Sequence, residues 1–146
     1  MLPNTFYYYF ASIDALAKCA LDELAPASVP HIAVALAEGN ALAIPEQAKV
    51  RMRIIAKIAR AYPRIRKHLE GALKNLWITE LRIDPEKMDA VDESVLDFMA
   101  AGAVGFIYEH LADADEDAAF DESFSTIART FGKSALSYAK ERGFLL

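Results

Sequence analysis

The sequence predicts an all-α protein. Apolar side chains recur with the 3.6-residue period of amphipathic helices along nearly the whole chain, and no segment alternates apolar and polar residues as a half-buried strand would. The 146 residues are enough for a domain with a hydrophobic core. Their composition, 54% hydrophobic and 25% charged, is typical of globular proteins.

Six helical segments are expected, separated by residues that begin or end helices. Ser12 is a good N-cap for the first segment, prolines stand between the first four, and Asp84-Pro85 precedes the fifth. Gly39 follows the second segment and Gly143 the last, which is the usual position of a helix stop. The expected helices cover residues 12–24, 30–38, 45–62, 64–81, 91–111 and 120–141.

The two C-terminal segments are the most hydrophobic. The fifth is apolar almost all the way round, so we expect it to be buried on more than one side. A glycine inside a helix costs ~1 kcal/mol relative to alanine, so Gly102 and Gly105 in its centre indicate a packing reason. The apolar stripe of the last helix consists of Phe120, Phe124, Ile127, Phe131 and Tyr138.

Charge is unevenly distributed around a net value of −5. Residues 49–74 contain nine Lys or Arg and one acid, whereas residues 80–122 contain fourteen Asp or Glu and two bases. The basic block is either a phosphate-binding face or part of two solvated helix faces, and the solvated faces are favoured. The two blocks can also attract each other, across the fold or across a dimer.

No motif indicates an enzyme, a cofactor or a metal. His31, His68 and His110 lack ligand spacing, and neither a phosphate-binding glycine loop nor a nucleophile elbow occurs. The acidic run 113–117 lacks the glycine and the terminal glutamate of a calcium loop. The single cysteine, Cys19, excludes an internal disulfide and is expected to be a small buried residue of its helix.

The chain is expected to be a soluble, cytoplasmic protein without a membrane partner. Its N-terminus lacks the basic region of a signal peptide. The longest nearly uncharged run, 98–108, is shorter than the ~20 residues that span a bilayer.

The most specific pattern lies near the N-terminus, where an aromatic-rich helix, a turn and a second helix follow one another. Thr5, Tyr7 and Phe10 are followed by Ser12 and Leu16. This pattern resembles the end of the helix-turn-helix of TetR/AcrR-family transcriptional regulators. In that family Thr-x-Tyr-x-x-Phe closes the recognition helix and Ser/Asn-Lys-x-x-Leu opens the connecting helix.

Two features differ from the family pattern. Ile13 replaces a phosphate-binding lysine, and the sequence begins at Met1 inside the turn, without the two helices that precede the recognition helix. We therefore expect a residual helix-turn-helix end with the connecting helix over 1–24, and a ligand-binding and dimerisation domain over 25–146. DNA would be a partner only if the missing helices are encoded upstream of Met1, which the in-frame codons there would reveal. Residual DNA contacts would come from Thr5, Tyr7, Tyr8 and Ser12.

The resemblance also implies a TetR-type regulatory domain that dimerises. Its last two helices would form a four-helix bundle with their copies in a second subunit, and its helices would surround a small apolar or aromatic ligand. The ligand-pocket candidates, chosen by composition, are Met52, Ile55, Tyr62, His68, Trp77, Phe98, Met99 and Phe106. The dimer-interface candidates are Ala101, Gly102, Gly105, Phe124, Ile127 and Phe131.

These features favour a homodimeric, ligand-responsive repressor in which the ligand shifts the connecting helix. The alternative is a ligand-binding and dimerisation module that does not bind DNA and modulates a full-length relative through mixed dimers. Ile13 favours the alternative. An all-α enzyme has little support, because no motif announces its chemistry.

Overall fold

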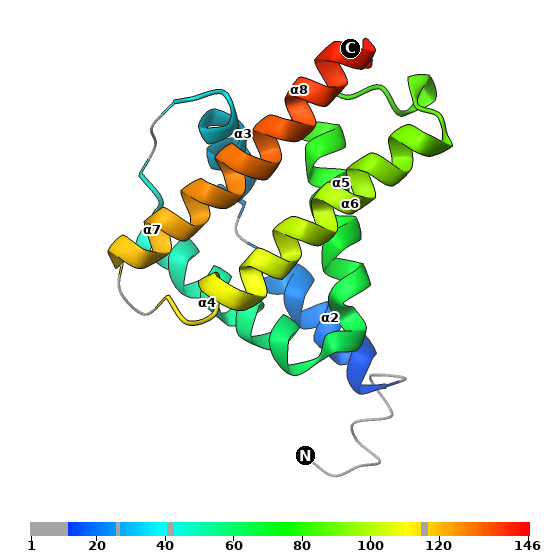
Figure 1. Ribbon diagram of the computed structural model, residues 1–146. Coiled ribbons are helices and arrows are strands. Elements are labelled where there is room, and N and C mark those ends of the chain that lie inside the picture. Colours follow the sequence, from blue (N-terminus) through cyan, green and yellow to red (C-terminus); the bar gives the residue numbers. More distant parts are fainter. Residues whose placement is uncertain (1–11, 26, 41–42, 115–116) are drawn as a thin grey trace.

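The computed structural model describes residues 12–25, 27–40, 43–114 and 117–146, and it confirms the all-α prediction (Figure 1). Apart from an isolated bridge between Ile83 and Leu145, the regular elements of these residues are helices. Their order is α2 (Ile13–Leu24), α3 (Val29–Ala37), α4 (Glu46–Ala61), η1 (Pro63–Ile65), α5 (Arg66–Glu80), η2 (Pro85–Lys87), α6 (Ala90–Phe106), η3 (Ile107–Leu111), α7 (Asp117–Thr126), η4 (Ile127–Gly132) and α8 (Lys133–Arg142).

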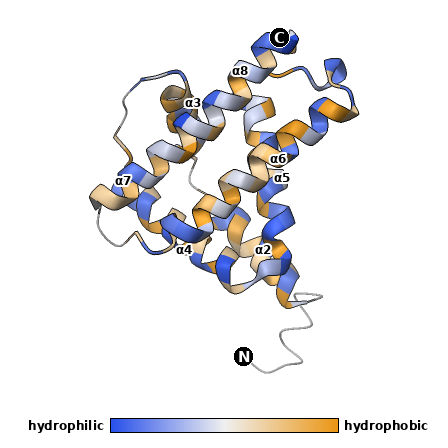
Figure 2. Ribbon diagram, viewed as in Figure 1, coloured by the Kyte–Doolittle hydropathy of each residue, from blue (hydrophilic) through white to orange (hydrophobic). Residues whose placement is uncertain are grey.

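Two long helices form one face of the molecule. The π-helical segment η3 continues α6, and η4 joins α7 to α8 in the same way. These two helices run antiparallel beside each other, with α5 packed behind α6 and α3 against η4 (Figure 1). Hydrophobic residues occupy most of α3, which lies on the side of η4 (Figure 2). Helices α2 and α4 pack together, and α4 contacts η3.

A buried carboxylate joins the start of α6 to the end of α8. The side chain of Asp92 is 1% exposed. Its oxygens accept hydrogen bonds from Tyr138 Oη at 2.7 Å and from the Arg142 guanidinium at 2.9 and 3.3 Å. Asp92 and Asp89 also form a capping box at the N-terminus of α6, in which each side chain accepts from the other's backbone N–H. The network fixes which turn of α8 faces which turn of α6.

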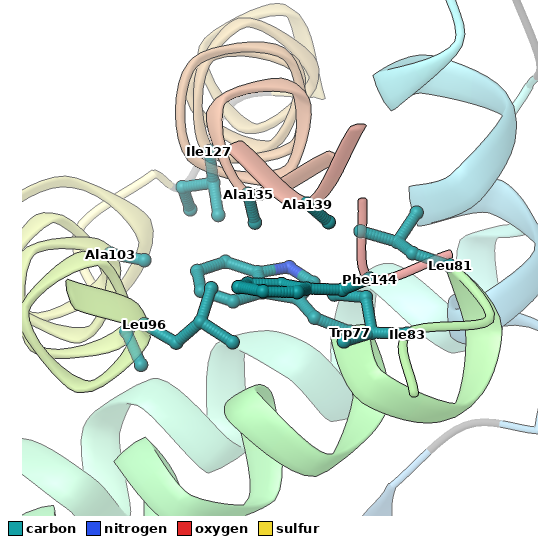
Figure 3. Packing of buried hydrophobic residues seen from close by; sticks show 10 residues of the cluster. Trp77, Leu81, Ile83, Leu96, Ala103, Ile127, Ala135, Ala139 and Phe144 are labelled. Atoms are coloured by element: carbon teal, nitrogen blue, oxygen red, sulfur yellow. The ribbon is translucent and has the colours of Figure 1, made fainter. Parts of the chain in front are cut away.

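The C-terminal segment is also held in place. After α8 ends at Gly143, which has a φ of 75°, Phe144 turns into the core and is 2% exposed. Its carbonyl accepts from Asp84 N at 2.7 Å, and Leu146 N donates to Arg82 O at 2.9 Å. Figure 3 shows the Phe144 ring against Trp77, so the last residues close the core between α5 and α8.

The basic and acidic blocks attract each other within the fold. Lys49 lies 3.1 Å from Asp121, and Arg60 lies 2.9 Å from Asp113. Lys74 binds Glu93 and Asp97. Burial acts to lower the pKa of Lys74, but hydrogen bonds to these two carboxylates outweigh burial and raise it. The uneven charge of the sequence therefore contributes to the contacts of α4 with α7 and of α5 with α6. Exposed pairs such as Arg60–Asp113 stabilise a fold only weakly.

The expected burial of Cys19 is wrong, because this residue is exposed. Helix α2 turns Ala17 and Leu21 toward α4 and η1, and Cys19 lies two residues from each on another side of the helix. Within the described ranges no single helix is both long and apolar enough to cross a bilayer. Only α2 and α3 taken together reach that length and composition, and they are bent by 72°.

The Asp92 network should make stability depend on acid pH. The hydrogen bond from Arg142 lowers the pKa of the Asp92 carboxyl far below its ordinary value; burial opposes this, and the Asp89 N–H and Tyr138 support it. A carboxyl whose pKa is lowered on folding stabilises the fold above its unfolded pKa of ~4, and this contribution is lost as pH falls below that value. We expect Asp92→Asn to lower the melting temperature at pH 7 by roughly 10 °C.

Thermal unfolding followed by circular dichroism at pH 7 and pH 3 tests this prediction. The difference between Asp92→Asn and the wild type should shrink at pH 3. Glu141→Gln, an exposed position on α8, is the matched control and should follow the wild type at both pH values. If the melting temperature of Asp92→Asn falls between pH 7 and pH 3 as much as that of the wild type, the role of Asp92 is contradicted.

Candidate functional site

A partly enclosed cavity of about 220 Å³ lies between α3, α4, α5 and the two π-helical segments. No charged side chain of the described residues lines it. Aliphatic residues make up most of the wall, and Trp77 and Phe124 add aromatic rings. The lining residues are Ala25, Val29, Pro30, Ala33, Val34, Ala37, Met52, Ile55, Leu69, Ala72, Leu73, Leu76, Trp77, Leu81, Ile107, Leu111, Phe124, Ile127, Ala128 and Gly132.

Both π-helical segments contribute to the cavity wall. Ile107 and Leu111 come from η3, and Ile127, Ala128 and Gly132 come from η4. A π-turn inserts an extra residue into a helix, so the side chains on either side of it no longer follow one stripe. The two long helices can therefore pack against each other along one part of their length and face the cavity along another. Such insertions occur frequently at functional sites.

The size of the cavity is energetically significant. Unfilled apolar space costs ~24 cal/mol per Å³, so 220 Å³ would cost up to about 5 kcal/mol if it stayed empty. The net stability of a typical domain is only ~5–15 kcal/mol. A dry apolar cavity of ~150 Å³ already binds benzene. The space therefore suits a compact organic ligand whose binding would recover part of this cost.

The cavity adjoins the first described helix. Its exposed lining residues, Ala25 and Ala72, mark the side on which it meets solvent. Ala25 is the C-cap residue of α2. Ile55 lines the cavity and also packs against the cluster of Ala17, Leu21 and Ile65 that holds α2 on α4. A molecule in the cavity would contact residues that position α2.

Three of the eight residues expected to line a ligand pocket do so: Met52, Ile55 and Trp77. The remaining five lie elsewhere, because composition identifies apolar residues but not the face on which they fall. Tyr62 is exposed at the end of α4, and Phe98 is 80% exposed on α6.

The other three residues make contacts elsewhere in the fold. His68 Nε2 lies 3.2 Å from Asp22 Oδ1, so His68 connects α5 to α2. Met99 lies beside Tyr138 in a shallow groove between α6 and α8. Phe106 packs against His110, with 4.3 Å between their ring centres.

The residues expected at a dimer interface fall into two groups. Phe124 and Ile127 are buried inside the chain and line the cavity, so neither is available to a second copy, contrary to expectation. Ala101, Gly102, Gly105 and Phe131 are partly or fully exposed around the outer surface of α6 and η4.

The packing reason for the two α6 glycines lies within this chain. A Cβ on Gly102 would stand 3.0 Å from the Phe131 ring, and one on Gly105 would stand 3.3 Å from Arg66 Nη2. These glycines let Phe131 and Arg66 lie across α6. On the same helix, Val91 and Phe98 are 68% and 80% exposed. They are seven residues apart and therefore share one face of α6.

Of the expected residual DNA contacts, Thr5, Tyr7 and Tyr8 lie outside the described residues. Ser12 is exposed, and its hydroxyl oxygen accepts from Ala15 N at 3.1 Å, as an N-cap does. Among the described residues, no group of His, Cys, Asp or Glu side chains could hold a metal ion.

Sequence reasoning did not predict two features of this region, namely the part of α3 in the cavity wall and the buried hydroxyl of Tyr108. Five residues of α3 line the cavity, and the signal for them was the apolar character of residues 29–37, in which His31 is the one polar residue. Tyr108 lies under the Arg66 guanidinium at 5.1 Å from the ring centre, and its buried hydroxyl has no hydrogen-bond partner among the described residues. Burial raises the pKa of Tyr108, and the Arg66 charge opposes the shift.

Comparison of the chain with protein-family models, with curated proteins and with solved structures finds no match. The likeness to TetR-type regulators therefore rests on the sequence pattern, and the chemistry of the site rests on the cavity itself.

Proposed function

We propose that this chain is the ligand-binding and dimerisation domain of a TetR-type transcriptional regulator. The observation that carries the proposal is the apolar cavity of about 220 Å³. The cavity has the size of a small organic ligand, and its wall contacts both ends of the proposed signalling path. One end is the pair of long C-terminal helices, and the other is α2, which corresponds to the connecting helix of the family.

The proposed mechanism is a population shift. A ligand that fills the cavity binds best to the conformation in which α3, α5 and η4 close around it. Ala25 and Ile55 connect that wall to α2, so the same conformation fixes the position of α2. In a dimer, this movement would change the spacing of two DNA-reading segments.

The second copy would pack on the outer face of α6 and α8. The exposed apolar side chains of Val91 and Phe98, with Gly102 on the same helix, support this surface. A phenylalanine that is 80% exposed contributes a large apolar area that a partner would remove from water.

A second candidate is a module that binds the ligand and dimerises but does not bind DNA. Ile13 favours it, because this residue is 50% exposed at the start of α2 and cannot neutralise a phosphate. A gel-shift titration of the purified chain separates the two candidates. Sequence-dependent binding that weakens steeply with salt would support the regulator, and its absence would support the module.

Filling part of the cavity should weaken ligand binding without unfolding the protein. Ala33 lines the cavity from α3, so we expect Ala33→Leu to weaken toluene binding at least tenfold and to raise the free energy of unfolding by about 1 kcal/mol. Trp77 is the only tryptophan and lies in the cavity wall, so its emission reports toluene binding directly.

Ala61→Leu provides the matched control, because Ala61 is exposed on α4 away from the cavity. This variant should bind toluene like the wild type. If saturating toluene leaves the Trp77 emission and the melting temperature of the wild type unchanged, the cavity is not a ligand site and the proposed function fails.

A charge on the outer face of α6 should separate the proposed dimer. We expect sedimentation equilibrium of the wild type to give twice the chain mass of 16.1 kDa, and Phe98→Glu to give a single chain. The control is Val50→Glu, an exposed apolar position on α4 that should leave the dimer intact. A wild-type monomer at micromolar concentration, or a Phe98→Glu dimer, would contradict this interface.

A further inference from the structure

Among the described residues, the cavity wall contains one polar side-chain group, the indole N–H of Trp77. Trp77 is 4% exposed, and its Nε1 has no hydrogen-bond acceptor among the described residues. Figure 3 shows this nitrogen on the ring edge that is turned toward α8, where Ala135 and Ala139 lie. An N–H that faces apolar side chains without an acceptor is unfavourable, and polar groups inside native proteins are nearly always paired.

Gly132 leaves this donor open to the cavity. Gly132 belongs to η4, is buried and lines the cavity together with Trp77. A Cβ at this position would stand 3.7 Å from Trp77 Nε1. Because glycine carries no side chain, no Cβ occupies this position between Trp77 Nε1 and Ala37.

The surroundings restrict what that atom can be. A charged ligand would be desolvated without a counter-charge, because no charged side chain of the described residues lines the cavity. A water molecule beside Nε1 would be poorly held, since a buried water needs two to four polar partners and the side chains of this wall offer one. An uncharged acceptor on an apolar ligand satisfies the N–H and fills the remaining space.

We infer that the ligand is a compact, uncharged molecule with an apolar body and one hydrogen-bond acceptor, such as a ketone or ether oxygen, that accepts from Trp77 Nε1. This inference rests on the proposed function, because it names the ligand class of the same cavity. It adds a specificity-determining pair, with Trp77 as the donor and Gly132 as the position that exposes it.

Two probes of nearly the same shape test the inference. Indane and 1-indanone share a fused bicyclic frame, and the ketone carries a carbonyl group where the hydrocarbon has a methylene. Their dissociation constants are measured by titration calorimetry for the wild type and for Trp77→Phe, which keeps an aromatic ring and removes the donor. Any change in cavity size affects both probes, so the ratio of the two constants isolates the hydrogen bond.

We expect Trp77→Phe to reduce the preference for 1-indanone over indane about tenfold, as the loss of one hydrogen bond to a buried acceptor does. A preference that does not change overturns the inference, while binding of indane still supports the apolar cavity. If neither probe binds the wild type at saturating concentration, the proposed function fails together with the inference.

Gly132→Ala is a second variant, and reduced stability cannot explain its expected effect on ligand preference. The added methyl group would meet Ala37 Cβ at 3.4 Å and Trp77 Nε1 at 3.7 Å, which are ordinary contacts. Alanine is also favoured over glycine in a helix, so this variant should unfold at the same or a higher temperature than the wild type. It should nevertheless reduce the preference for 1-indanone about fivefold, because the methyl group stands beside the donor.

Gly71→Ala is the matched control, since a Cβ at this position on α5 meets nothing within 4 Å. It should keep the wild-type preference. A Gly132→Ala protein that retains the full preference would show that the ketone oxygen does not approach Trp77 from the side of Gly132, and the proposed pair would be wrong.

Discussion

The buried carboxylate of Asp92 is the constraint on which the arrangement of the two long helices depends. A charge that is 1% exposed is tolerated only where partners satisfy it, and here the partners come from the far end of the other helix, at Tyr138 and Arg142. Only one register of the antiparallel pair brings these groups together. With the ends fixed in this way, Phe131 meets Gly102 in the middle of the pair.

In this register η4 packs on α6 through Phe131, and both π-helical segments also line the cavity. The cavity is costly for the fold, and the molecule offsets this cost with close packing next to it. Trp77, Leu81 and Ile127 belong to the cavity wall and also to the core that Phe144 closes. In the proposed function, this side of the wall would stay fixed when a ligand binds, and the response would fall to α3 and α2.

Sequence periodicity predicts the helices of this fold well and their contacts poorly. Phe124, Ile127 and Phe131 form one stripe on an ideal helix, but η4 inserts an extra residue at this point. Phe124 and Ile127 consequently face the cavity, whereas Phe131 faces α6. Likewise, the sequence shows small residues in the centre of α6 but does not reveal that Phe131 and Arg66 of the same chain lie next to Gly102 and Gly105. The sequence predicts a helix over residues 30–38, yet the place of this helix beside η4 depends on tertiary packing that no local pattern encodes.

The connection between the cavity and α2 matters for both candidate functions. Apolar contacts of α2 involve the cluster of Ala17 and Leu21 with Ile65, and one polar contact joins Asp22 to His68. Ala17 and Leu21 are the buried residues of α2, and among the described residues they form the apolar part of its contact with α4 and η1. A ligand can shift an equilibrium only by its difference in affinity for the two states, and a shift from 1:99 to 99:1 requires ~5.5 kcal/mol. A ligand that fills the cavity would recover up to about 5 kcal/mol, which is the free energy that the empty cavity costs. Only the part of this free energy that differs between the two positions of α2 can shift the equilibrium, so the proposed response requires a cavity that a ligand fills well in one position and poorly in the other.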